Sequence, residues 1–312
     1  MSTVSDIEIA AKIMVIGIGG AGSNTVNSMI SEHVDGVTYV CLNTDKQDIE
    51  QCKAENKIQL GKKLTKGLGA GSNPEIGEQA AYETQKEIED LIQQQDMLIL
   101  TCGMGGGTGT GATPVVAKLA KKFNILTVGV VTKPFTFEGK IRTNNARIGI
   151  DNLKQYVDTM IVISNNMLLK IVDKHTSITQ AFRESDKILA QTIYGITGLI
   201  NKPALINLDF ADVTTIMKNR GIAYIGIGTG TGINAAMKAV EAALVSPLLE
   251  TDIRGASHVL LNFTGDIALL DINDAASKVQ STLAPDAEII FGADYNADLH
   301  EQVVATIIAT GL

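Results

Sequence analysis

A glycine-rich segment between an apolar run and a helical run constrains this chain more than any other part of its sequence. Residues 102–116 read CGMGGGTGTGATPVV, with six glycines among residues 102–111. The run DMLILT (96–101) before it predicts a buried strand, and ATPVVAKLAKKF (112–123) after it predicts a helix. Glycines before a helix let backbone N–H groups approach an anion closely, and the helix dipole favours negative charge there. The segment therefore predicts a phosphate site that is built from main-chain amides.

A second glycine loop has the same context near the N-terminus. GIGGAGSN (17–24) follows the apolar run AKIMVIG (11–17) and has the G-x-G-x-x-G spacing. Dinucleotide-binding enzymes share this spacing, and a tight turn that binds nothing would also produce it. Two such loops fit a nucleoside triphosphate, because its phosphates can occupy both of them. A third stretch, KGLGAGSNPEIG (66–77), either folds over the same phosphates or forms a flexible surface loop.

Neither glycine loop contains the lysine of a P-loop. The chain has no G-x-x-x-x-G-K-[ST] motif, so we exclude a P-loop protein. We expect the hydroxyls of Thr108 and Thr110, a helix N-terminus and Mg²⁺ to assist the amides in holding phosphate.

The order of apolar and helical segments predicts two connected domains. Strands alternate with helices through the first half, which implies a parallel sheet with helices on both faces. A long helix from about Ile178 to Ile200 follows and stops near Pro203. The fold class is therefore α/β: a parallel-sheet nucleotide-binding domain joined by a long central helix to a smaller mixed-sheet α+β domain. The strands predicted in order are 11–17, 37–42, 96–101, 124–132, 159–164, 223–230, 258–265, 287–292 and 303–310, and the other helices are 19–30, 73–95, 234–245 and 272–283.

Composition excludes several classes of protein. The 312 residues are 45% hydrophobic with a net charge of −8, which fits an ordinary globular chain and argues against a nucleic-acid-binding protein. No apolar stretch of about 20 residues predicts a membrane span, and the start MSTVSDIEIAAK is not a secretory signal. Cys41, Cys52 and Cys102 form an odd, scattered set, which predicts buried reduced thiols in a cytosolic protein.

Several motifs together resemble the FtsZ family, the bacterial relatives of tubulin. The match runs in order from about Lys12 to Leu312 through GIGGAGSNTVNSMI, NTD, LTKGLGAGSNPEIG, GGGTGTGATPVVA, VTKPFTFEGKIR, INLDFADV and SPLLE. The resemblance implies a GTPase that uses Mg²⁺, converts GTP to GDP and phosphate, and assembles head to tail into the filaments of the division ring. It also implies a GTP-binding domain at 1–177, a connector helix at 178–202 and a C-terminal GTPase-activating domain at 203–312.

The resemblance carries nucleotide contacts over to positions that match its motifs. It implies ribose contacts from Glu138 and Arg142, although their spacing alone favours a solvated ion pair. It implies that Phe182 stacks on guanine, where the pattern alone favours a core residue. A carboxylate at Asp186 would accept hydrogen bonds from guanine N1–H and N2–H₂, whereas adenine offers it the wrong edge. The other implied contacts are Gly19, Gly20, Ala21, Gly22, Ser23, Asn24, Gly71, Gly103, Gly105, Gly106, Gly107, Thr108, Gly109, Thr132 and Asn165.

The segment NLDFAD (207–212) is implied to carry the hydrolysis. In the family this loop reaches the nucleotide of the next subunit, where Asp209 and Asp212 would orient the attacking water and Asn207 would contact the phosphates. Whether either aspartate acts as a base or only orders water is left open. Without the resemblance, capping of the following helix is the favoured role of both aspartates. A site shared in this way makes a head-to-tail contact, which propagates into a filament.

The chain departs from the family pattern at three places. Ser164 and Asn166 replace a proline and an acidic residue around Asn165, which predicts an altered base pocket. Thr214 replaces a basic residue, which predicts a subunit interface of different strength. The chain ends at IIATGL, where the family continues into a tail that binds division proteins and membrane tethers, and a trimmed chain and a natural absence stay equally open.

The resemblance also implies partners and a location. We expect the protein to bind copies of itself, neither nucleic acid nor the membrane directly, and to lie in the cytoplasm at the mid-cell division site. Two alternatives remain. A nicotinamide-dependent oxidoreductase explains residues 12–30 but leaves residues 103–111 unused and lacks a suitable acidic residue, since only Asp45 is near. A nucleotide-binding scaffold that assembles without turnover is disfavoured by the presence of both Asp209 and Asp212.

Overall fold

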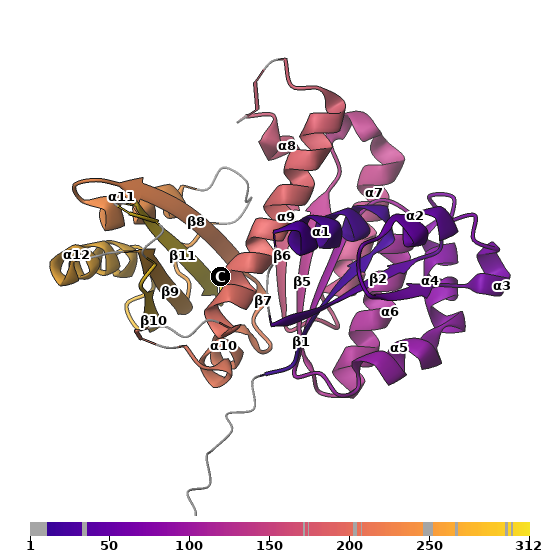
Figure 1. Cartoon of the computed structure of the whole chain (residues 1–312), viewed down its shortest axis with the longest axis horizontal. Helices are drawn as coiled ribbons and strands as arrows, with labels where there is room; N and C mark the ends of the chain where they lie inside the picture. Colours follow the sequence, from indigo (N-terminus) through magenta and orange to yellow (C-terminus); the bar gives the residue numbers. More distant parts are fainter. Residues whose placement is uncertain are drawn as a thin grey trace, which may run out of the picture.

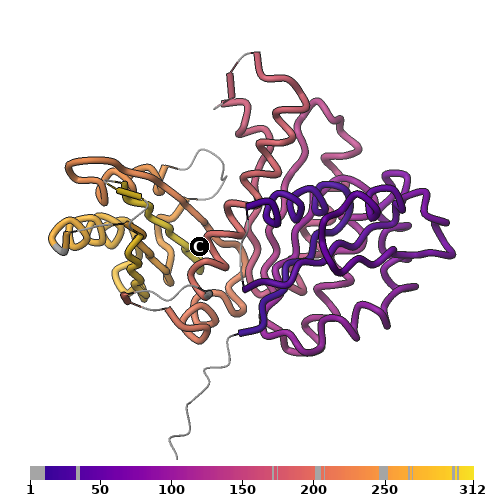
Figure 2. The backbone as a smooth tube through the Cα atoms, in the orientation of Figure 1, coloured from indigo at the N-terminus to yellow at the C-terminus, as the bar shows by residue number. Residues whose placement is uncertain are grey.

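Two sheets lie on either side of one long helix in the computed structural model of this chain (Figure 1). The structure describes residues 11–32, 36–170, 172–173, 175–201, 205–206, 208–245, 252–265, 268–296, 299–300 and 302–312. The long helix is α9 (Ile178–Asn201), close to the predicted limits. The tube in Figure 2 shows the first half of the chain on one side of α9 and the C-terminal half on the other.

The larger sheet has seven parallel strands in the order β3-β2-β1-β4-β5-β6-β7. Its central strands are buried on both faces, which explains their continuous apolar sequences. The strands are β1 (Ile13–Ile18), β2 (Val37–Asn43), β3 (Asn56–Gln59), β4 (Met97–Gly103), β5 (Leu126–Lys133), β6 (Thr159–Ser164) and β7 (Gly221–Ile222).

Two layers of helices cover this sheet. Ile13 and Val15 of β1 belong to a core shared with α1 and α9, whereas Met14 and Ile16 belong to a core shared with α4, α5 and α6. Successive strand residues point to opposite faces, so one strand contributes to both cores. The helices of this half are α1 (Gly19–Ser31), α2 (Lys46–Gln51), α3 (Lys62–Thr65), α4 (Pro74–Glu83), α5 (Gln85–Ile92), α6 (Thr108–Lys122), α7 (Lys140–Leu153), α8 (Asn165–Leu168) and the 3₁₀ helix η1 (Thr136–Glu138).

The strand order reverses between β1 and β4, which places a switch point there. β1 pairs with β2 on one side and with β4 on the other. β1 and β4 each run into a glycine loop, which leads from β1 into α1 and from β4 into α6. In open α/β sheets, ligands bind outside the carboxyl ends of the strands at such a point. The topology therefore brings the two predicted glycine loops together.

The smaller sheet is mixed, with the order β10-β9-β11-β8. β9 and β10 are parallel, and β11 runs antiparallel to both β8 and β9. The elements are α10 (Phe210–Met217), β8 (Tyr224–Thr231), α11 (Ala235–Leu244), β9 (His258–Gly265), α12 (Leu269–Gln280), β10 (Glu288–Asp294) and β11 (Gln302–Thr310). The fold class predicted from the sequence is confirmed.

Two helix predictions were wrong in detail. The helix predicted over 73–95 is divided at Thr84 into α4 and α5. The Thr84 hydroxyl accepts a hydrogen bond from the Gly61 amide and donates to the Ala80 carbonyl, so side-chain bonding replaces regular helix there. Helix α6 begins at Thr108, inside the glycine-rich segment, and not at residue 112. The predicted cap at Asn73 is correct, since its side chain accepts a hydrogen bond from the Glu75 amide.

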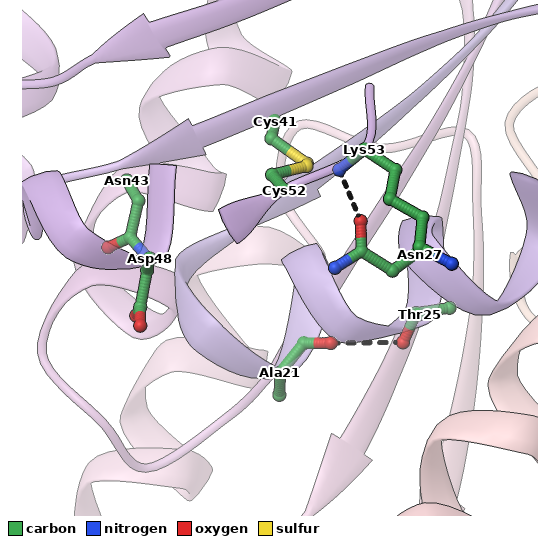
Figure 3. Close-up of a disulfide and its surroundings, with 8 residues drawn as sticks. All are labelled: Ala21, Thr25, Asn27, Cys41, Asn43, Asp48, Cys52 and Lys53. Atoms are coloured by element: carbon green, nitrogen blue, oxygen red, sulfur yellow. Dashed lines mark hydrogen bonds between the residues drawn. A yellow bond between two sulfur atoms is a disulfide. The ribbon is translucent and has the colours of Figure 1, made fainter. Parts of the chain in front are cut away.

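The prediction of three reduced thiols was also wrong. Cys41 at the end of β2 and Cys52 just after α2 form a disulfide (Figure 3). The strand–turn–helix unit between them brings the two side chains together, and counting cysteines does not detect this. Cys102 is a free, buried thiol as predicted, and burial raises its pKa to about 12. Among the described residues, no helix is both long and apolar enough to cross a membrane.

Candidate nucleotide site

A pocket of about 260 Å³ lies where the two glycine loops meet. The loops touch, since a Cβ built on Gly19 would lie 3.0 Å from the Gly109 nitrogen. A Cβ on Gly106 would meet nothing within 4 Å, so this backbone faces open space. The residues that line the pocket are Ile18, Gly19, Gly20, Ala21, Asn43, Asp45, Asp48, Gly69, Gly103, Gly106, Gly107, Thr108, Gly109 and Arg142.

Two helices begin at this pocket without a side-chain cap. Neither α1, which starts at Gly19, nor α6, which starts at Thr108, has a capping side chain or an acidic residue in its first turn. Asp45 caps α2, Asn73 caps α4 and Asp209 caps α10, whereas α7, α8 and α11 also start without a capping side chain, so the distinctive feature here is that two bare starts share one pocket. The first amides of a helix need an outside acceptor. Two uncapped helix starts at one pocket therefore form an anion site.

The hydroxyls and carboxylates of the pocket are fixed by local hydrogen bonds. The Thr108 hydroxyl lies 2.6 Å from that of Thr44, and both residues are buried. Asp48 accepts a hydrogen bond from the side-chain NH₂ group of Asn43, and Asp45 accepts one from the backbone nitrogen of Gln47. Each carboxylate keeps an oxygen for another partner, so the pocket offers oxygen ligands as well as N–H donors.

Five of the residues predicted at the phosphates lie outside this lining: Gly22, Ser23, Gly71, Gly105 and Thr110. The Thr110 hydroxyl accepts a hydrogen bond from the Gly105 nitrogen, so it shapes the loop from behind. In the third glycine stretch, Gly69 lines the pocket and Gly71 does not. The Ser23 hydroxyl is buried and has no hydrogen-bond partner among the described residues, which leaves one polar group of α1 available for a ligand.

The two predicted ribose contacts are paired with each other. Arg142 Nε lies 2.9 Å from Glu138 Oε2, and the other oxygen of Glu138 accepts a hydrogen bond from the Phe135 amide. Arg142 also lines the phosphate pocket. The ion pair that spacing alone favours is therefore present, at the edge of the site. Thr132 is buried, and its carbonyl accepts a hydrogen bond from the Met104 nitrogen at the end of β4.

The four predicted base contacts come from three elements. Phe182 on α9 is 37% exposed and packs edge-on against Phe135, so its ring is only partly used in packing. Asp186, one turn further along α9, accepts a hydrogen bond from Asn24 of α1. Burial raises the pKa of Asp186 to about 7, and the hydrogen bond from Asn24 opposes that shift. Asn165 lies at the carboxyl end of β6 and is buried.

Sequence reasoning missed Ser185, which contacts Asn165 directly. The Ser185 hydroxyl donates to Asn165 Oδ1 over 2.7 Å. A serine three residues after Phe182 was the available signal, because both then share a helix face. The departure at Asn166 has a structural explanation too: its Oδ1 accepts hydrogen bonds from the amide and the hydroxyl of Thr136. An amide oxygen therefore makes the link to η1 that a carboxylate oxygen could make.

The predicted catalytic aspartates form a reciprocal cap on α10. Asp209 accepts a hydrogen bond from the Asp212 nitrogen at 2.8 Å, and Asp212 accepts one from the Asp209 nitrogen at 3.0 Å. The capping role favoured by the pattern is therefore observed. One oxygen of each carboxylate stays free of the cap, and Asp209 is exposed. Asn207 lies outside the described residues.

Helix α10 lies at the edge of the large sheet opposite the glycine loops. Met217, its last residue, accepts a hydrogen bond from the hydroxyl of Thr159, the first residue of β6. Lys218 Nζ donates to Asn124 Oδ1 just before β5. Figure 1 shows α10 at the end where β1 starts, away from α2 and α8. The six residues of β6 alone separate the two edges by about 20 Å.

This arrangement places the chain among α/β proteins that bind a nucleotide at a switch point of a parallel sheet. Comparison with known families makes the assignment specific. Residues 12–173 match the model of the Tubulin/FtsZ family GTPase domain, and residues 221–312 match that of the FtsZ family C-terminal domain. The chain belongs to the Tubulin/FtsZ family. It is therefore a GTPase that binds GTP and GDP and a polymer-forming cytoskeletal protein.

Solved structures agree with this assignment. An FtsZ dimer from M. jannaschii, described as empty, is 47% identical with a TM-score of 0.91, over 96% of this chain and 88% of that one. A point mutant of M. jannaschii FtsZ is 46% identical with a TM-score of 0.91, over 97% and 92%. The fold is also shared with CetZ2 from Haloferax volcanii in a GTPγS-bound protofilament, at 19% identity and a TM-score of 0.82, over 96% and 92%.

Proposed function

We propose that this protein hydrolyses GTP at the contact between two of its own copies within a head-to-tail filament. One copy would hold the nucleotide on its two glycine loops, and the next copy would supply Asp209 and Asp212. The observation that carries this proposal is the position of α10. Helix α10, which begins at these aspartates, lies at the amino edge of the sheet (Figure 1), and the pocket lies at the carboxyl edge, with about 20 Å between the two edges along β6. Intramolecular catalysis is incompatible with that separation.

The phosphates would be held by the uncapped starts of α1 and α6. Their free amides and helix dipoles supply positive potential without a lysine. The Thr108 hydroxyl and the Arg142 guanidinium add further donors at the pocket. Fixed donors of this kind need no rearrangement when charge builds up on the γ-phosphate oxygens.

The two aspartates would position water for attack on the γ-phosphorus. The reaction forms a bond from the water oxygen to the γ-phosphorus and breaks the bond to the oxygen that bridges to the β-phosphate. GDP and inorganic phosphate leave. In the reciprocal cap each carboxylate is held by a backbone N–H, and its remaining oxygen can accept a hydrogen bond from water. Phosphoryl transfer depends mainly on positioning and charge stabilisation, which this arrangement provides.

Mg²⁺ fits the pocket as a companion of the nucleotide. Among the described residues there is no group of three or more His, Cys, Asp or Glu side chains that could hold a metal ion alone. Mg²⁺ usually takes one or two carboxylates and keeps phosphate and water oxygens as its other ligands. Asp45 and Asp48 line the pocket with a free oxygen each, so these two residues would hold it. Bound there, it would neutralise phosphate charge.

The base pocket would select guanine over adenine. The Asp186 carboxylate would accept hydrogen bonds from N1–H and N2–H₂, while Phe182 stacks on the ring. Asn24 and Asn165 would complete the polar rim. Asn24 already holds Asp186 by a hydrogen bond, so the acceptor is oriented before the base arrives.

Head-to-tail assembly would join the nucleotide face of one copy to the α10 face of the next. Leu68 is 83% exposed beside Asp45, and Leu205 is 78% exposed near β10. Large apolar side chains exposed at both ends suit burial in such a contact. A contact between different faces does not close on itself, so it continues as a filament.

We further propose that these filaments act at the division site in the cytoplasm. Membrane tethers and other division proteins would bind them there. Disulfides are rare in cytosolic proteins apart from those of hyperthermophiles and those with redox roles. The Cys41–Cys52 bond therefore restricts the kind of cytoplasm in which this form of the protein occurs.

Replacing Asp212 tests the catalytic assignment. Asp212→Asn keeps an oxygen that can accept from the Asp209 nitrogen, so the cap survives while the charge is lost. We expect phosphate release to fall by at least about a hundredfold, with GDP affinity and melting temperature unchanged. Glu87→Gln, at the start of α5, is the matched control and should behave as the parent.

Two other results would count against the proposal. If Asp212→Asn lost nucleotide affinity in dilute solution, the aspartate would belong to the pocket of its own subunit. If the parent protein assembled with GTP yet released no phosphate at any concentration, the protein would be a scaffold without turnover.

A further inference from the structure

We propose that Ser185 is a positioning residue for base recognition, because its hydroxyl fixes which end of the Asn165 amide faces the nucleotide. This inference rests on the proposed guanine pocket and names a residue that determines its specificity. Ser185 lies between two of the proposed base contacts on α9. It does not need to touch the base itself.

The contact joins two elements that meet at the carboxyl edge of the sheet. Asn165 is the first residue of α8 and directly follows β6, while Ser185 lies about two turns into α9. Their side chains are 2.7 Å apart, and each residue is 4% exposed. At this burial, neither side chain exchanges its partner freely with water. The hydrogen bond therefore fixes the orientation of the asparagine.

The surrounding face of α9 carries the rest of the base pocket. Phe182, Ser185 and Asp186 follow the i, i+3, i+4 pattern, so the three lie together on one face of the helix. Phe182 packs edge-on against Phe135 with ring centres 5.4 Å apart, which sets the position of its ring. The hydrogen bond from Ser185 therefore orients Asn165 beside the Phe182 ring and the Asp186 carboxylate.

The chemistry of the amide makes this hydrogen bond informative. An asparagine side chain offers an oxygen that accepts and an NH₂ group that donates, and a half-turn exchanges them. Here the oxygen accepts from Ser185, and the Asn165 NH₂ group donates no hydrogen bond to any described residue. The NH₂ group is therefore free to donate to a ligand that supplies an acceptor. The space beside the Asn165 NH₂ group therefore suits an acceptor atom of a ligand.

Guanine meets both requirements of a pocket arranged in this way. It carries acceptors at O6, N3 and N7 for the Asn165 donor, and it carries the N1–H and N2–H₂ donors for Asp186. Without the Ser185 hydroxyl, Asn165 would be free to turn and present its oxygen. An oxygen at that position can accept from the exocyclic amine of adenine. Selectivity for guanine should then fall, even though Asp186 and Phe182 are intact.

The test measures how well the pocket separates two bases that share the same diphosphate. GDP and ADP are titrated into dilute protein, because diphosphates exclude turnover as a cause. In Ser185→Ala we expect the ratio of GDP affinity to ADP affinity to fall about tenfold, the value of one hydrogen bond. Ser185→Thr keeps the hydroxyl and should retain the parent ratio. Thr197→Val, which removes another buried hydroxyl from α9, should retain it as well.

The outcomes separate this inference from the proposed function. If Ser185→Ala weakens both nucleotides equally, or leaves the ratio unchanged, Ser185 has only a packing role and the inference is overturned. If the parent protein shows no preference for GDP, the guanine pocket itself is refuted. Should Ser185→Ala fail to fold, Ser185→Cys preserves most of the volume with a weaker donor. An unchanged ratio in that variant would overturn the inference equally.

Discussion

Single side chains at this site use one polar atom for the fold and keep another for a ligand. Asp45 and Asp48 each accept one local hydrogen bond while lining the phosphate pocket. Asp209 and Asp212 hold each other through backbone amides, and Asn165 is held through its oxygen alone. Side chains fixed in this way lose little conformational freedom when the ligand arrives. The capping role of the aspartates is thus compatible with their proposed chemistry.

The Asp186 carboxyl makes nucleotide affinity depend on pH. Burial raises its pKa to about 7, whereas guanine requires the ionised form. Below pH 7 the free protein must lose a proton to bind, so we expect GDP affinity to be about tenfold lower at pH 6 than at pH 8. Titrations of GDP across this range measure the effect.

A matched variant and a stability measurement check the cause of that dependence. Asp186→Asn cannot ionise and should bind GDP weakly at every pH, with no slope. Without nucleotide the sign reverses. The folded carboxyl keeps its proton up to about pH 7, whereas the unfolded one loses it near the usual value of 3.8. The free energy of unfolding should therefore decrease as the pH rises from about 3.8 to about 7. A free energy that does not change over this range would contradict the assignment.

At the level of elements, the phosphate pocket is the place where two helices without a side-chain cap start side by side. The helices α2, α4 and α10 begin with a capping side chain, whereas α1 and α6 begin bare at the pocket. Helix α4 also supports the glycine loop from behind, since a Cβ on Gly77 would lie 2.3 Å from the Gly107 carbonyl oxygen. The glycines of this region therefore serve two purposes, close helix packing and access for a ligand.

Two glycine variants separate these purposes. A Cβ on Gly111 would lie 1.9 Å from the Pro74 carbonyl oxygen, so Gly111→Ala should cost about 2–3 kcal/mol of unfolding free energy. A Cβ on Gly106 would meet nothing within 4 Å, so Gly106→Ala should leave stability unchanged. Its methyl group would instead occupy phosphate space and weaken GTP binding by at least about tenfold. Thermal melts and nucleotide titrations measure both, and a stable Gly111→Ala protein would refute the packing role.

For the molecule as a whole, the sequence predicted the architecture better than the details of the site. Apolar runs fully buried in a parallel sheet and a long amphipathic helix are local signals, so the fold class and α9 were predictable. The meeting of the two glycine loops followed from strand alternation. The domain limits at 177 and 202 remain predictions, and α10 contacts both sheets.

The features that were missed depend on contacts between segments distant in the chain. The Ser185 contact crosses from α9 to the end of β6, so the spacing from Phe182 indicates the helix face of Ser185 but not its partner Asn165. The Cys41–Cys52 pairing needs the geometry of the turn between β2 and α2. The break at Thr84 depends on a hydrogen bond from Gly61. Propensity and spacing describe none of these contacts, because each is decided by tertiary packing.

Hydrolysis at a filament contact requires an active site divided between two molecules. The most direct measurement is the rate of phosphate release per molecule against protein concentration, followed together with light scattering. We expect almost no release while the protein is monomeric and a sharp onset at the concentration where scattering begins. A full rate per molecule in dilute, monomeric protein would contradict the shared site.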